Sequence, residues 1–158
     1  MSEMWRLLRP DAVMALEDPK ILSSMPRYVG ILKGRFLPRF MVSRYVPVNW
    51  DLESSEGELW ELHNRSLVEM ESLMRDLDSG KIGHKEIGEP PERSLLHLKA
   101  KIGESLMAPC RLCERRCGAD RLRGELGFCR VGREFKAHSC FDHMGEEPEV
   151  VPSFTVYG

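Results

Sequence analysis

The sequence of 158 residues lacks any apolar run long enough to cross a membrane, because a spanning helix needs about 20 such residues. Its first residues include Glu3, Arg6 and Arg9, so they also lack the apolar core of a secretion signal. The sequence also lacks a large excess of one charge, since 23 basic and 25 acidic side chains leave a net charge of −2. This balance points to no particular class of partner. We therefore expect a cytoplasmic, globular protein with no membrane association.

Carboxylates are missing between residues 19 and 50, where basic residues alternate with aromatic ones. This mixture suits binding of a nucleic-acid backbone and its bases, with Arg35, Arg39 and Arg44 as the basic candidates. The next stretch, residues 51–92, holds twelve carboxylates against four basic side chains. Because two such stretches can pair with each other inside the fold, we favour that interpretation over nucleic-acid binding.

The size of the chain allows one core and a small appendage, but not two full domains. We expect an α+β protein that is mostly α. Residues 1–108 are predicted to form a helical amino-terminal region, residues 109–133 a small metal-binding loop module, and residues 134–158 a β segment.

The clearest helical pattern covers residues 56–77. Ser55 and Glu58 have the spacing of a capping box, and leucine and methionine residues recur on one side of the predicted helix. A second helix is predicted over residues 92–107, ending at Pro109, and it leads directly into the cysteine-rich stretch.

Cysteine is scarce as well, but four of the five cysteines fall within twenty positions. Cys110, Cys113, Cys117 and Cys129 follow the spacing C-x2-C-x3-C-x11-C. In a reducing compartment such clustering indicates thiolate ligands rather than disulfides. These four residues form the predicted metal site, and a tetrahedral zinc ion or an iron–sulfur cluster is held by this type of ligand. The spacing alone does not choose between them.

The charge around these cysteines supports a bound metal. Four thiolates on a zinc ion or on an oxidised four-iron cluster leave a net charge of about −2, which is costly in a partly buried site unless neighbours offset it. Residues 111–136 supply eight basic side chains against four acidic ones. Gly118, Gly124 and Gly127 provide the turns that bring backbone amides close to the sulfur atoms.

The polar residues beyond the cysteine run give no catalytic assignment. Cys140 could replace one ligand of the cluster or act as a free thiol, but we favour a small buried residue on a strand over residues 134–141. His143 lacks a third group that would orient it for nucleophilic catalysis. Glu146 and Glu147 are adjacent, so on a strand they point to opposite faces and form no carboxylate pair.

Three runs of the sequence together resemble a known family. They are Ser94-Leu-Leu-His-Leu-Lys99, the cysteine run from Cys110 to Cys129, and His143-x-Gly-Glu-Glu-Pro148. Over about residues 92–158 the chain resembles the opening of uncharacterised radical S-adenosylmethionine iron–sulfur proteins similar to pyruvate formate-lyase activating enzymes. The resemblance implies that residues 154–158 form the first strand of a partial barrel.

In that family a C-x3-C-x2-C motif follows this strand and holds the four-iron cluster that binds and cleaves S-adenosylmethionine. The motif is absent here, and Cys110, Cys113 and Cys117 have the reverse spacing. The resemblance therefore implies the amino-terminal, metal-binding portion of such an enzyme, inactive alone. S-adenosylmethionine would bind only in the completed enzyme, with a second chain supplying the rest of the barrel. A split enzyme, a truncation and a stand-alone protein all remain open.

An alternative function belongs to a different class of protein. In it, zinc at the four cysteines stabilises a helical module that binds nucleic acid or a protein partner, with the arginines near the cysteines adding to the basic surface.

Overall fold

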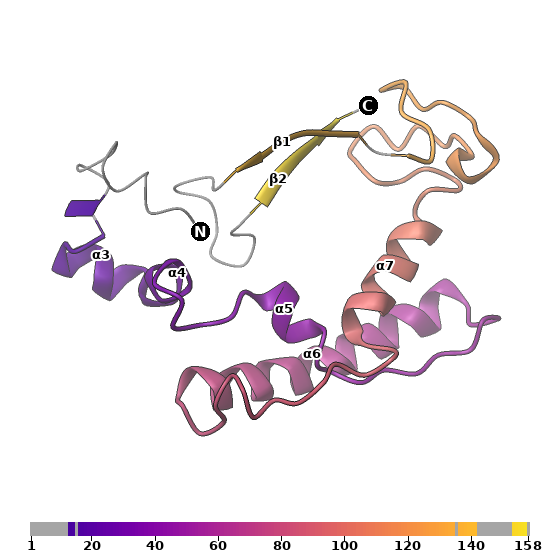
Figure 1. Cartoon of the computed structure of the whole chain (residues 1–158). Coiled ribbons are helices and arrows are strands. Elements are labelled where there is room, and N and C mark those ends of the chain that lie inside the picture. Colours follow the sequence, from indigo (N-terminus) through magenta and orange to yellow (C-terminus); the bar gives the residue numbers. More distant parts are fainter. Residues whose placement is uncertain (1–12, 15, 135, 142–152, 158) are drawn as a thin grey trace.

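The computed structural model describes residues 13–14, 16–134, 136–141 and 153–157 (Figure 1). This part of the chain is mostly helical, as the sequence predicted. Its elements are α3 (Pro19–Ser24), α4 (Pro26–Leu32), α5 (Arg39–Ser43), α6 (Glu56–Asp78), α7 (Leu95–Ser105), the 3-10 helix η1 (Arg121–Arg123), β1 (Lys136–Phe141) and β2 (Ser153–Tyr157). No helix of the described residues is both long and apolar enough to cross a membrane.

Helix α6 begins at the predicted capping box. The Ser55 hydroxyl accepts a hydrogen bond from the Glu58 amide at 3.3 Å, and the Glu58 carboxylate accepts one from the Ser55 amide at 2.7 Å. Two of the amide groups at the helix start are thereby satisfied. The helix then runs to Asp78, one residue beyond the predicted end.

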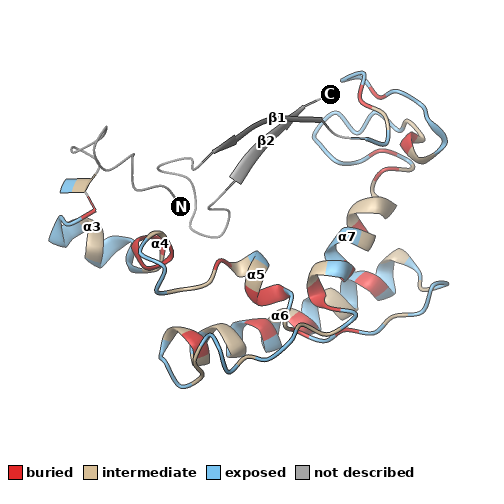
Figure 2. Ribbon diagram, in the orientation of Figure 1, coloured by how far each residue is buried: buried red, intermediate tan, exposed pale blue. Residues whose placement is uncertain are grey.

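Helices α5, α6 and α7 pack against one another around the larger core (Figure 2). Met70, Leu95 and Leu98 are fully buried there. The complete buried set is Val42, Val46, Val48, Leu59, Met70, Leu77, Leu95, Leu98 and Ile102. The stripe predicted on residues 56–77 is therefore a core-facing helix side.

Helix α7 begins three residues later than predicted because the chain before it is extended. The Val48 amide donates to the Arg93 carbonyl at 3.2 Å, and the Leu95 amide donates to the Val46 carbonyl at 2.9 Å. This pairing uses backbone groups that a longer helix would need. Ser94 then caps the helix through a box shared with His97.

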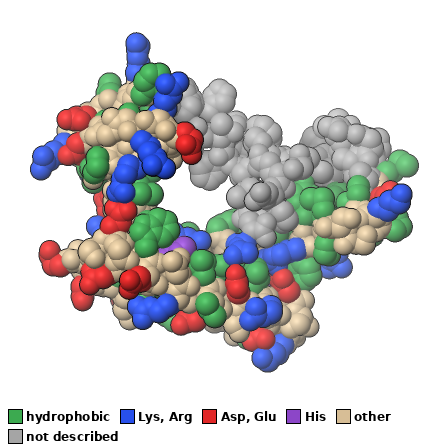
Figure 3. All heavy atoms as spheres, turned by 180° about the vertical axis from the view of Figure 1, so that it is seen from behind, with side chains coloured by type: hydrophobic (Ala, Val, Ile, Leu, Met, Phe, Trp, Pro, Cys, Tyr) green, Lys and Arg blue, Asp and Glu red, His purple; other side chains and the backbone are tan. Residues whose placement is uncertain are grey.

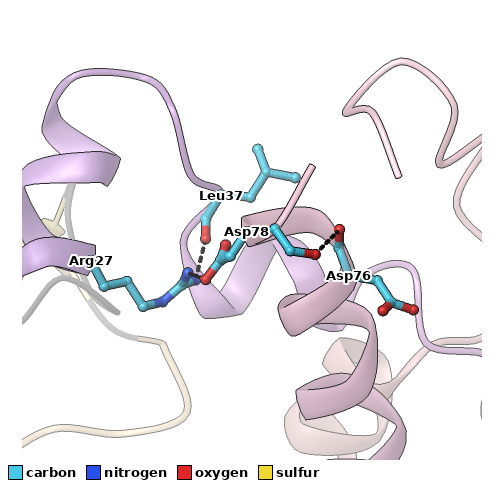
Figure 4. A network of polar contacts seen from close by, with 5 residues as sticks. Arg27, Leu37, Asp76 and Asp78 are labelled. Carbon is cyan, nitrogen blue, oxygen red and sulfur yellow. Dashed lines mark hydrogen bonds and ion pairs between the residues drawn. The ribbon is translucent and has the colours of Figure 1, made fainter. Parts of the chain in front are cut away.

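A second, smaller core contains Leu16, Tyr28 and Val29, and Ile21 and Leu22 of α3 pack against it. Arg27 of α4 links this part to the end of α6, since its guanidinium donates to the Asp78 carboxylate and to the Leu37 carbonyl (Figure 4). The helical region therefore contains two cores connected by a charged contact rather than one continuous core.

Strands β1 and β2 form an antiparallel pair, with Lys136 opposite Tyr157 and Phe141 opposite Ser153. The register shifts between Ala137 and Ser139. Cys140 lies on β1, opposite Phe154. The predictions for His143, Glu146 and Glu147 concern positions outside the described residues.

Candidate metal centre

The cysteine module starts where α7 ends, with Cys110 at its centre. The Cys110 amide donates to the Ala119 carbonyl at 3.0 Å, and the Gly118 amide donates to the Cys110 carbonyl at 3.1 Å. This reciprocal pair brings the first cysteine beside the chain that follows the third. Cys110 is only 1% exposed, so its thiol is enclosed by the module.

Arg121 of η1 lies among three of the predicted ligands. Its Nε atom donates to Cys110 Sγ at 2.9 Å, and its Nη2 atom lies 3.2 Å from Cys129 Sγ and 3.9 Å from Cys117 Sγ. Its Nη1 atom donates to the Val131 carbonyl. Arg121 as a whole is 3% exposed. One buried cation thus connects sulfur atoms from three separate turns.

Backbone amides also point at these sulfur atoms. Hydrogen bonds from the amides of Ala119 and Phe128 lower the pKa of Cys117 to about 7, and the Cys110 thiol and Arg121 add to this effect. The pKa of Cys129 is lowered by Arg121 first and then by the amide of Val131. In both turns the amide two residues after the cysteine donates to its sulfur, an arrangement that stabilises thiolate over thiol.

The fourth predicted ligand, Cys113, has no hydrogen bond to Arg121 among the contacts of the described residues. Like Cys117 and Cys129 it is exposed, and it lies in a turn closed by a hydrogen bond of 3.0 Å from the Arg116 amide to the Cys113 carbonyl. Among the described residues, no group of three or more histidine, cysteine, aspartate or glutamate side chains is placed to hold a metal ion. The structure therefore brings three of the four thiols to one guanidinium, not all four to one point.

The turns at the cysteines are tight. Arg116 and Arg130, beside Cys117 and Cys129, have φ angles of 42° and 59°, a left-handed conformation that is uncommon outside glycine. A Cβ atom on Gly127 would lie 2.2 Å from Arg121 Nη2. Only glycine fits this position without moving the guanidinium.

The donor set of the cysteine module fits a metal in its chemistry. Four soft thiols, amide donors aimed at two of them and a buried cation to offset thiolate charge match the chemistry of a four-thiolate zinc ion or iron–sulfur cluster. The ligands would be Cys110, Cys113, Cys117 and Cys129. Binding requires the four thiols to move to one point, because no three of them among the described residues are placed to hold a metal ion.

The module is attached to the helical body by ion pairs at its two ends. Arg111 Nη2 lies 2.6 Å from Glu56 Oε2 at the start of α6. Arg133 Nη2 lies 3.9 Å from Glu104 Oε1 on α7. The cysteine module therefore contacts the helical body near both of its ends.

Part of the basic and aromatic stretch is used within the fold. Arg27 pairs with Asp78, which is one ion pair between the basic stretch and the acidic one. Arg93 covers the Trp50 ring at 5.2 Å from its centroid and donates to the Trp50 carbonyl at 3.0 Å. Tyr28 is buried. These aromatic rings are not presented for stacking on bases.

Other arginines of this stretch remain available. Arg39 and Arg44 form no ion pair with any described residue, and Arg35 lies beside the Phe36 ring. On the face shown in Figure 3, basic and acidic side chains of the described residues are interspersed. That mixture gives little long-range attraction for a polyanion.

The chain is similar in sequence to an archaeal protein. No family model and no solved structure matches the chain. An uncharacterised protein of Methanocaldococcus jannaschii, MJ0674, is 31% identical over 131 residues, which make up 83% of this chain. The match covers 36% of the length of that archaeal protein.

Proposed function

We propose that this chain is the amino-terminal, metal-binding portion of a radical S-adenosylmethionine iron–sulfur protein resembling pyruvate formate-lyase activating enzymes. The observation that carries the metal assignment is the gathering of Cys110, Cys117 and Cys129 around Arg121, with backbone amides directed at the sulfur atoms. The wider family rests on the sequence resemblance over about residues 92–158.

The residues of the module have separable roles in this proposal. Cys110 is the buried anchor, and its backbone pairs with residues 118–119 to close the module. Cys117 and Cys129 sit in tight turns whose amides stabilise thiolates. Cys113 is exposed and completes the ligand set from its own turn. When bound, the metal or cluster stabilises the fold or carries an electron, and four protein ligands leave it no open position for S-adenosylmethionine.

The β segment is the proposed contact with the rest of a barrel. Two paired strands are only marginally stable by themselves, because an exposed sheet edge leaves amide and carbonyl groups unpaired. We propose that a further strand, from this protein or from a second chain, extends the sheet of β1 and β2. Because the match covers only 36% of the archaeal relative, the rest of that protein is long enough to include such a barrel.

Metal analysis after anaerobic purification tests the metal assignment. We expect either about one zinc per chain without visible absorbance, or about four irons with the absorbance of a cluster. Single Cys→Ser changes at the four predicted ligands should lower metal content. Cys140→Ser is the matched control, because Cys140 lies on β1 outside the module. A wild-type chain that binds neither metal would refute the assignment.

One observation favours a second function, a zinc-stabilised module that binds nucleic acid. Burial lowers the pKa of Lys99, and the nearby positive charge of Arg39 lowers it further. Two cations close together, without a carboxylate partner among the described residues, favour an anion between them. Salt-sensitive retention of RNA or DNA, lost on Arg39→Glu, would support this function. Retention that is equal for Arg39→Glu and wild type would exclude this site.

A further inference from the structure

We propose that Arg121 is the positioning residue of the metal centre, and that its guanidinium remains bonded to ligand sulfur atoms when the metal is bound. The proposal deepens the proposed function and rests on it. It assigns to one arginine the charge compensation that the sequence spreads over eight basic residues.

The geometry of the guanidinium supports this role. Nε and Nη2 lie on the same edge of the planar group, and they donate to Cys110 Sγ at 2.9 Å and to Cys129 Sγ at 3.2 Å. This edge therefore holds two sulfur atoms side by side, as it holds two carboxylate oxygens in other proteins. Each thiolate keeps further lone pairs for a metal, so hydrogen bonding and ligation are compatible.

The burial of Arg121 makes the thiolates its natural partners. A buried guanidinium is costly unless an anion lies beside it. Arg121 is 3% exposed, and among the described residues no carboxylate forms an ion pair with it. The thiols at 110, 117 and 129 are the groups available to provide negative charge. A four-thiolate site of net charge about −2 then falls to about −1 with the arginine.

Two backbone contacts hold the arginine in place. Its Nη1 atom donates to the Val131 carbonyl, and its own amide donates to the Met107 carbonyl at 3.2 Å. Gly127 leaves the space that the guanidinium fills. Arg121 thereby connects the end of α7 to the turn around Cys129, which brings together ligands that are nineteen positions apart in the sequence.

The test compares Arg121→Met with Arg123→Met. Arg123 belongs to the same 3-10 helix but is 87% exposed and lies 3.5 Å from the Asp120 carboxylate, so it is a matched control. The measurement is the metal affinity of the purified chain in competition with a chelator. For Arg121→Met we expect affinity to fall about 10- to 100-fold, the usual cost of removing a group that orients metal ligands. Arg123→Met should match wild type.

Two further variants separate positioning from general loss of structure. Arg121→Lys keeps the charge but lacks the paired donors, so it should recover only part of the affinity. Gly127→Ala keeps every donor but places a Cβ where the guanidinium lies, so it should also weaken binding. In cobalt-substituted protein, loss of hydrogen bonds to sulfur should shift the thiolate-to-metal absorption bands, which a distant destabilisation would leave unchanged.

The outcomes are distinct. Equal affinities and equal cobalt spectra for wild type, Arg121→Met and Gly127→Ala would overturn the role of Arg121 while leaving the metal site standing. An equal fall for Arg121→Met and Arg123→Met would also overturn it, since a general charge effect would then suffice. A wild-type chain that takes up neither zinc, iron nor cobalt would refute the metal site and this role together.

Discussion

The thiol of Cys117 should be reactive at neutral pH in metal-stripped protein. Amides of Ala119 and Phe128 donate to its sulfur and lower its pKa to about 7 from an ordinary value of 9.0. The thiolate is the reactive form of cysteine. Alkylation of Cys117 should therefore show a midpoint near pH 7 in the folded chain and near pH 9 when the chain is unfolded in urea.

The expected rate difference follows from these two values. At pH 7 about half of the folded thiol is ionised, against about 1% of an ordinary one, a gain of about 50-fold. A less basic thiolate is also a weaker nucleophile, and a Brønsted slope of about 0.4–0.5 removes about 6- to 10-fold over two pH units. The net expectation is alkylation about 5- to 8-fold faster in the folded protein than in the unfolded one at pH 7.

Peptide mapping measures this thiol separately from the others. Trypsin cleavage after Arg116 and Arg121 releases Cys-Gly-Ala-Asp-Arg, in which Cys117 is the single cysteine. Iodoacetamide pulses at different pH values, in the presence and absence of urea, give both midpoints from the same peptide. Coinciding midpoints would refute the amide-to-sulfur hydrogen bonds on which the site description depends.

The same pKa shift predicts how stability depends on pH. Below about pH 7 the Cys117 thiol is protonated in both folded and unfolded chains and contributes nothing. Between about pH 7 and 9 the unfolded chain binds more protons, so this contribution to stability rises with pH and is complete above about 9. Urea midpoints of the metal-stripped chain should show the rise, and Cys117→Ser should reduce it, leaving the part due to Cys129, whose pKa is also lowered.

Three changes in the helical body test the packing that supports the site. Leu98→Ala empties a fully buried position of the larger core and should cost about 2–5 kcal/mol in urea unfolding. Ser55→Ala removes the cap of α6 and should cost about 0.5–2 kcal/mol. In a double-mutant cycle, Arg27→Met and Asp78→Asn should show a coupling of about 0.5–3 kcal/mol. Their side chains are only 19% and 26% exposed. Additive effects would mean that this ion pair does not join the two cores.

The helices that sequence predicted best are those whose signals are local. The capping box at Ser55 and the apolar stripe of residues 56–77 are contained within α6, and the structure confirms both. The start of α7 was predicted at residue 92 instead of 95, because pairing of residues 93–95 with 46–48 is a contact between distant segments. Local sequence patterns do not predict contacts between segments that are far apart in the sequence.

The short helices and the role of Arg121 also depend on contacts between distant residues, which local sequence patterns do not predict. Helices α3 and α4 are only six and seven residues long, and the small core around Tyr28 and Val29 holds them. Arg121 is one of eight basic residues near the cysteines. Its sequence context does not distinguish it, because its burial arises from contacts with Met107 and Val131.

Helix α6 contacts the cysteine module at one end and α4 at the other. Its first residue, Glu56, pairs with Arg111 of the module, and its last, Asp78, pairs with Arg27 of α4. In a helix of 23 residues the first and last residues are separated by about 33 Å at 1.5 Å per residue. The two pairs therefore act independently, and α6 is the rigid element between them. Breaking the Arg27–Asp78 ion pair should loosen α3 and α4 without changing metal affinity. Replacing Arg121 with Met should change metal affinity without loosening α3 and α4. A variant at Asp78 that lost metal would show that the module and the small core are coupled through α6.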